Sequence, residues 1–69
     1  MTLKVVPLPA LHGIKFDVIF EDYYVVTMEM DDQQLRQHRC GVADAITLHI
    51  KQWLAERDYD VDDLYVIFY

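Results

Sequence analysis

The feature that most constrains the fold is a change in the spacing of the apolar residues near residue 31. In residues 14–20 and 23–30, apolar side chains occur at about every second position, which is typical of β-strands with one buried face. In residues 42–54 they recur with the period of an α-helix. The chain then ends in LYVIFY, which is β-branched and aromatic. The sequence therefore predicts strands, then a helical region, then a last strand.

Two alternating runs with a short polar break between them predict a β-hairpin. The more apolar residues of both runs are even-numbered: Ile14, Phe16, Val18, Phe20, Tyr24, Val26, Met28 and Met30. We expect the even-numbered residues to face the helix. A further strand is expected at residues 3–6, and the prolines that follow it, Pro7 and Pro9, predict that it is short and lies at an edge of the sheet.

The helical region allows one helix or two. Asp31 or Asp32 can cap its start. A single helix over residues 32–57 would be ~39 Å long, whereas strands of seven residues span only ~23 Å, so we expect a break near residues 40–41. The apolar helix face comprises Val42, Ala45, Ile46, Ile50, Trp53 and Leu54.

These elements predict a single domain of the α+β class over residues 1–69. The expected architecture is a two-layer sandwich, in which one long helix, with or without a short helix before it, covers one face of a small, mostly antiparallel sheet. The sheet has three to four strands, and the element order is β(β)β-α-β. A chain this short buries only roughly 60% of its unfolded surface, and Cys40 is its only cysteine, so no internal disulfide can stabilise it.

The sheet face turned away from the helix is the first candidate site. It is expected to carry Ile19, Tyr23, Val25, Tyr65, Ile67 and Tyr69. A two-layer fold has no second helix to cover these residues, and an exposed apolar patch with tyrosines is typical of protein interfaces. The patch predicts a partner-binding or homodimer surface. The alternative is that the N-terminal segment, with Leu8 and Leu11, folds over it.

A run of acids before the last strand is the second candidate site. Residues 56–63, named here the acidic segment, contain one base and five acids, which are Glu56, Asp58, Asp60, Asp62 and Asp63. Acids near a helix C-terminus oppose the helix dipole, so local helix stability does not explain them. They predict a surface that docks on a basic groove of another protein by mimicking nucleic-acid phosphates. The alternative is that they only keep the protein soluble.

The same acids resemble a calcium-binding EF-hand loop only in part. Asp58, Asp60 and Asp62 match the first three ligand positions. The loop requires Gly at its sixth position and Glu at its twelfth, where this chain has Asp63 and Tyr69. The pattern therefore predicts no metal site.

Other candidate chemistry is equally incomplete. His38 and Cys40 are two residues apart, so on a helix they point in different directions and cannot share a metal. We expect Cys40 to be a small buried residue and His49 to be a histidine at the edge of the core. The chain has no serine or asparagine and only two glycines, which excludes a serine nucleophile and glycine-rich phosphate loops. We predict no catalytic residue and no cofactor, and therefore no enzyme.

Composition limits the partners. Twelve acids against six bases give a net charge of −6, which repels nucleic-acid phosphates. The sequence shows neither the apolar region of a signal peptide nor the ~20 apolar residues of a membrane span, so we expect a cytoplasmic protein that binds neither nucleic acid nor membranes.

We therefore predict a small acidic protein-binding module, an inhibitor or adaptor of the phage or plasmid type, that binds a basic protein and forms a homodimer. One alternative is a structural or assembly subunit with no target beyond its own oligomer. The other is a thiol- or metal-dependent enzyme.

Overall fold

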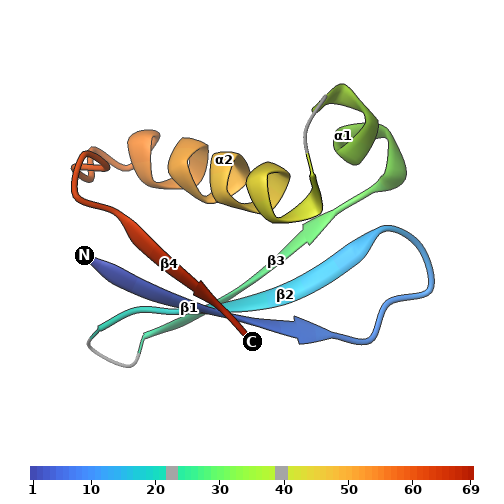
Figure 1. Ribbon diagram of the computed structural model, residues 1–69, viewed down its shortest axis with the longest axis horizontal. Coiled ribbons are helices and arrows are strands. Elements are labelled where there is room, and N and C mark those ends of the chain that lie inside the picture. Colours follow the sequence, from blue (N-terminus) through green and yellow to red (C-terminus); the bar gives the residue numbers. More distant parts are fainter. Residues whose placement is uncertain (22–23, 39–40) are drawn as a thin grey trace.

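The computed structural model describes residues 1–21, 24–38 and 41–69. Its elements, in chain order, are β1 (Thr2–Leu8), β2 (Ile14–Ile19), β3 (Val25–Met30), α1 (Asp32–Gln37), α2 (Val42–Ala55) and β4 (Tyr65–Phe68). The four strands form one sheet in the order β3-β2-β1-β4, and both helices lie on the same side of it (Figure 1). The predicted two-layer α+β fold is confirmed, and its helical region is divided into a short and a long helix.

The N-terminal strand lies in the middle of the sheet, so the prediction of a short edge strand at residues 3–6 was wrong. β1 has seven residues, runs antiparallel to β2 and runs parallel to β4. The Tyr69 N–H donates to the Val5 carbonyl (3.0 Å), so the odd-numbered residues of β1 direct their backbone groups toward β4. Pro7 is odd-numbered and lies beyond the register of β4. The N–H that proline lacks therefore removes no bond of the sheet.

The chain between β3 and β4 crosses over the sheet. β2 and β3 form the predicted antiparallel hairpin, and the helices then carry the chain past β2 and β1 to the opposite edge (Figure 1). A capping box at Asp31, directly after the last residue of β3, starts α1. In it, Asp31 Oδ1 accepts from the Gln34 N–H (2.7 Å), and Gln34 Oε1 accepts from the Asp31 N–H (2.9 Å).

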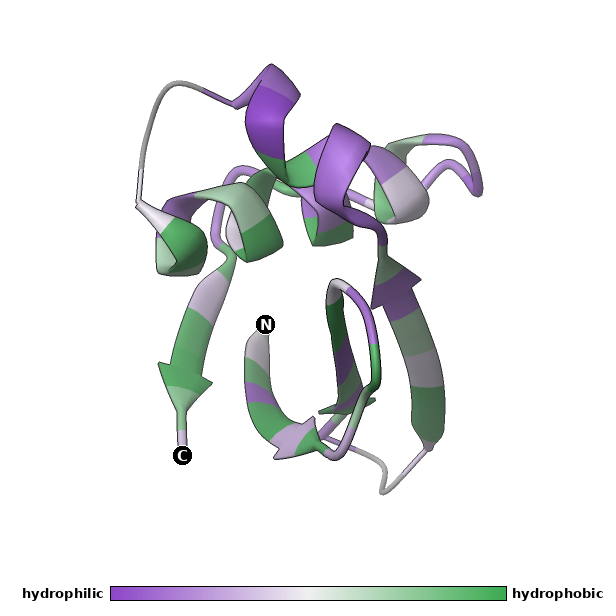
Figure 2. Ribbon diagram, turned by 90° about the vertical axis from the view of Figure 1, so that its right-hand side faces the viewer, coloured by the Kyte–Doolittle hydropathy of each residue, from purple (hydrophilic) through white to green (hydrophobic). Residues whose placement is uncertain are grey.

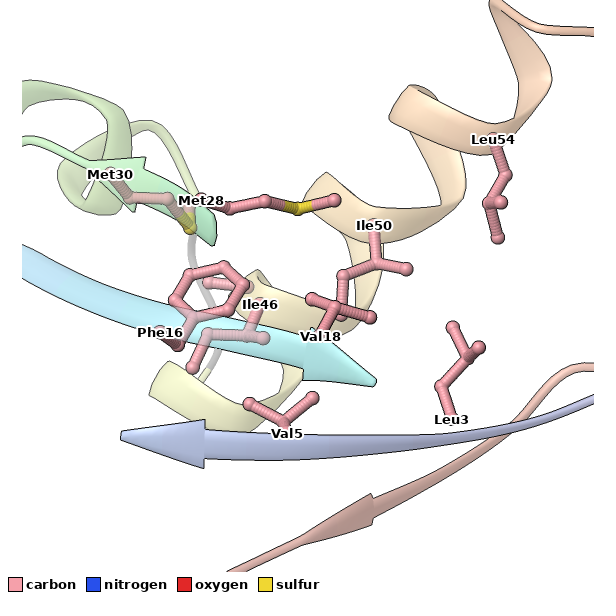
Figure 3. Packing of buried hydrophobic residues seen from close by; sticks show 10 residues of the cluster. Leu3, Val5, Phe16, Val18, Met28, Met30, Ile46, Ile50 and Leu54 are labelled. Carbon is pink, nitrogen blue, oxygen red and sulfur yellow. The ribbon is translucent and has the colours of Figure 1, made fainter. Parts of the chain in front are cut away.

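The hydrophobic core lies between the sheet and α2, and its side chains point into this space from β1, β2, β3 and α2 (Figure 3). The buried residues are Leu3, Val5, Phe16, Val18, Met28, Met30, Ala45, Ile46, Ile50 and Leu54. Even-numbered residues of β2 and β3 face the helix, as predicted. Val42 was wrongly expected in this core, since its side chain is 56% exposed.

Gly13 provides a test of the connection between β1 and β2. Its φ of +65° favours glycine, and a Cβ there would lie 2.1 Å from the Met30 carbonyl oxygen. We expect Gly13→Ala to lower the free energy of unfolding by about 2 kcal/mol or more, because the clash is with backbone and the conformation is strained. Urea denaturation followed by circular dichroism measures this.

Gly41→Ala is the matched control. Gly41 is the N-cap of α2, has a φ of −66°, and has nothing within 4 Å of an added Cβ. The Gly41→Ala substitution should lower the free energy of unfolding by less than about 1 kcal/mol. Equal unfolding free energies for the two variants would contradict the close approach of Gly13 to β3.

Candidate functional site

The sheet face opposite the helices, named here the open face, has no described element over it (Figure 1). The strand registers align Ile67, Lys4, Ile19 and Val25 in one row across all four strands. The N-terminal segment does not cover this row, because residues 2–8 are themselves a strand of the sheet. The predicted exposure of this face is therefore correct, and the alternative of a covering N-terminal segment is wrong.

The predicted residues of the open face differ in exposure. Val25, Tyr65 and Tyr69 are exposed, whereas Ile19 and Ile67 are half-buried by their neighbours in the sheet. Tyr23, also predicted here, lies outside the described residues. β1 adds Lys4, Val6 and Leu8, which the sequence analysis missed because it placed this strand at an edge. Figure 2 shows that β4 is hydrophobic along most of its length.

The acidic segment connects α2 to β4, and all five of its acids are exposed. Its backbone is held by local bonds: the Tyr59 N–H donates to the Leu54 carbonyl (3.0 Å), and Asp60 Oδ1 accepts from the Asp62 N–H (2.9 Å). Asp63 precedes the first residue of β4, Tyr65, by two positions. The acidic segment and the open face therefore adjoin at the start of β4.

A hollow that sequence reasoning missed lies beside the acidic segment. It has a volume of about 530 Å³, and we name it the aromatic cleft; its lining residues are Met1, Phe20, Glu21, Tyr24, Trp53, Arg57 and Tyr59. The Phe20 ring lies 6.0 Å from the Trp53 ring and 5.9 Å from the Tyr24 ring, between centroids. These residues come from the start of the chain, from the segment between β2 and β3, and from α2 and the residues that follow it. Their spacing along the chain carries no signal for such a cleft.

A second hollow, of about 390 Å³, lies between the first turn of α2 and the ends of β1 and β4. Val42 and Phe68 line it, and both are more than 40% exposed. β1 extends beyond β4 here, and Phe68, the last residue of β4, borders the space under the start of α2 without filling it. This explains why Val42 is not part of the core.

The remaining candidates for chemistry are His49 and Cys40. The His49 ring packs edge-on against Phe16, with the centroids 6.4 Å apart, as expected at the edge of the core. Burial lowers the pKa of His49 below its ordinary value of 6.5; His38 lowers it further and Glu56 opposes the change. Cys40 lies outside the described residues, and among those described no group of three or more His, Cys, Asp and Glu could hold a metal ion.

In the described part of the chain, neither helix is long and apolar enough to cross a membrane. Comparison of the chain with models of known protein families, with curated proteins and with solved structures finds no match. The surfaces themselves therefore provide the argument for function. They are the open face, the acidic segment and the aromatic cleft.

Asp58 provides a test of the geometry of the acidic segment. It is the described non-glycine residue with positive φ (62°), and its N–H donates to the Ala55 carbonyl (3.1 Å), so it occupies the position after a helix end that glycine favours. We expect Asp58→Gly to raise the free energy of unfolding by about 0.5–1 kcal/mol, because it relieves the backbone and removes a negative charge from the helix C-terminus.

Asp62→Gly is the control for this substitution. It removes the same charge from the same segment but has no positive φ to relieve. Thermal and urea unfolding should show a lower stability for this variant, since the added backbone freedom has no compensation. A stabilised Asp62→Gly variant would mean that charge alone accounts for the effect at Asp58.

Proposed function

We propose that this protein is a small binding module that docks on a basic surface of another protein and acts by occupying that surface rather than by catalysis. The observation that carries the proposal is the continuity of the acidic segment with the open face. Asp62 and Asp63 lie just before β4, whose Tyr65 and Ile67 belong to the open face. Carboxylates steer a basic partner toward the site, and tyrosines supply the apolar contact after docking.

The position of the acids supports docking because, apart from Asp60, which accepts from the Asp62 N–H, the fold gains little from them. All five are exposed, they follow a helix C-terminus that disfavours negative charge, and Asp58 occupies a position better suited to glycine. The competing explanation is solubility, since charges beside an apolar edge strand such as β4 suppress aggregation. The two explanations differ in one respect: solubility depends on total charge, whereas docking depends on where the charge lies.

The test compares two double variants with the same change in charge. Asp62→Asn with Asp63→Asn removes two acids from the acidic segment; Asp32→Asn with Asp44→Asn removes two exposed acids from the helices on the other side of the sheet. Each protein is immobilised and used to capture partners from an extract of the native cell, with quantification by mass spectrometry. The first variant should recover about fivefold less of the wild-type partner at about 50 mM salt, and the difference should shrink at about 500 mM, where charges are screened.

The control double variant should capture the partner at the wild-type level. Equal losses for both variants would show that only total charge matters and would favour the solubility explanation. Undiminished capture by the Asp62 and Asp63 variant would remove the acidic segment from the proposed site.

The open face also supports a second proposal, a homodimer in which two copies pack these faces together. The observation in its favour is the row that contains Ile67, Ile19 and Val25, because three of the four strands contribute an apolar side chain to it, with Lys4 at the β1 position. In this arrangement the open face belongs to the dimer, and the acidic segments remain free to dock on a target.

Light scattering after size-exclusion chromatography tests the homodimer. The wild-type protein should have the mass of two chains, and Ile67→Thr should shift it to one chain, because the change keeps strand propensity while removing apolar contact. Leu48→Thr is the matched control: Leu48 is 43% exposed on α2, and this variant should remain a dimer. A single-chain mass for the wild type would contradict the homodimer, and a mass of many chains would favour an assembly subunit.

A further inference from the structure

We infer that the aromatic cleft binds an arginine side chain of the basic partner, and that Arg57 occupies this site in the free protein. This inference rests on the proposed function, because the cleft is proposed to bind a side chain of the basic partner that the acids attract. Charge attraction by the acids does not distinguish arginine from lysine, which carry the same charge, whereas the cleft should bind arginine more tightly.

The walls of the cleft are suited to a planar cation. Trp53, Phe20 and Tyr24 lie in succession, with ring centroids about 6 Å apart, and Tyr59, which is 53% exposed, also lines the cleft. Aromatic faces attract cations, and the flat guanidinium stacks on them better than the compact ammonium of lysine. At about 530 Å³, the cleft has room for a side chain from outside.

Charge selects a cation over an anion as the ligand. Glu21 lines the cleft, and its Oε1 accepts a hydrogen bond from the Thr2 N–H (2.7 Å), which holds the carboxylate in place. Glu56, Asp58 and Asp60 alternate with the lining residues Arg57 and Tyr59 along the chain, so they place exposed carboxylates close to the cleft. With a net charge of −6 on the protein, an anionic or nucleic-acid ligand is repelled.

Arg57 shows how a guanidinium binds here. Its Cζ lies 3.8 Å from the centre of the Trp53 ring, and its Nη1 donates to the Trp53 carbonyl (3.0 Å) and lies 3.8 Å from Glu56 Oε2. The side chain is nevertheless 47% exposed, and such exposed contacts are weak. A partner arginine, brought close by the acids, can therefore displace it from the ring.

The experiment uses Trp53, the only tryptophan of the chain, as a fluorescent reporter in the chain of residues 1–69. Acetylated and amidated hexa-arginine and hexalysine peptides are titrated at about 50 mM salt. We expect hexa-arginine to bind about three- to fivefold more tightly than hexalysine and to change the fluorescence of Trp53. Tyr59→Leu should abolish this preference while leaving hexalysine binding unchanged.

The Arg57→Gln variant distinguishes displacement of the Arg57 guanidinium from a general effect of charge. Loss of one positive charge strengthens the binding of both peptides alike, whereas loss of a competing guanidinium strengthens the binding of hexa-arginine alone. The ratio of hexa-arginine affinity to hexalysine affinity should therefore rise about threefold. Circular dichroism checks that both variants are folded, which their exposed positions favour.

Equal affinities for the two peptides in the wild type, with both weakened by Asp62→Asn and Asp63→Asn, would overturn the arginine site and leave the acidic docking surface standing. An unchanged affinity ratio in Arg57→Gln would overturn the displacement. If neither peptide binds at low salt, both the arginine site and the docking function are overturned.

Discussion

Pairing of β1 on both of its sides is the interaction on which the rest of the structure depends. β1 bonds to β2 on one side and to β4 on the other, so it joins the N-terminal hairpins to the strand that returns after the helices. Because β4 pairs with β1 alone, the position of the acidic segment is also set by this strand. Leu3 and Val5 contribute buried side chains from the same strand, so sheet pairing and core packing reinforce each other.

The described elements cover only one face of the sheet. One helix of fourteen residues, α2, packs on that side, and no described element lies over the opposite face (Figure 1). The described elements also leave hollows at both ends of α2, one beside Val42 and Phe68 and the other beside Trp53 and Tyr59. The candidate surfaces of this protein are therefore the places that the described elements of the two-layer fold leave uncovered.

These surfaces meet around the end of α2 and the start of β4. The acids leave the helix there, the aromatic cleft opens beside them, and the tyrosines of the open face begin with Tyr65. Long-range charge and short-range aromatic contact act at different stages of association, the first on the rate of encounter and the second on the lifetime of the complex. Their proximity supports one partner for both, which is the form of binding proposed for this protein.

Local pattern determined most of the fold. Alternation at residues 14–20 and 23–30, a cap at Asp31 or Asp32 and the helical spacing after Gly41 each depend on neighbours in sequence, so they predicted the hairpin, the long helix and the buried face, and left open whether a short helix precedes it. Two things were decided only by tertiary structure. Pro7 is compatible with a central strand because β4 stops before it, and Trp53 lines a cleft because Phe20 and Tyr24 arrive from a distant part of the chain. Sequence spacing records local geometry, and contacts between distant segments exist only once the chain is folded.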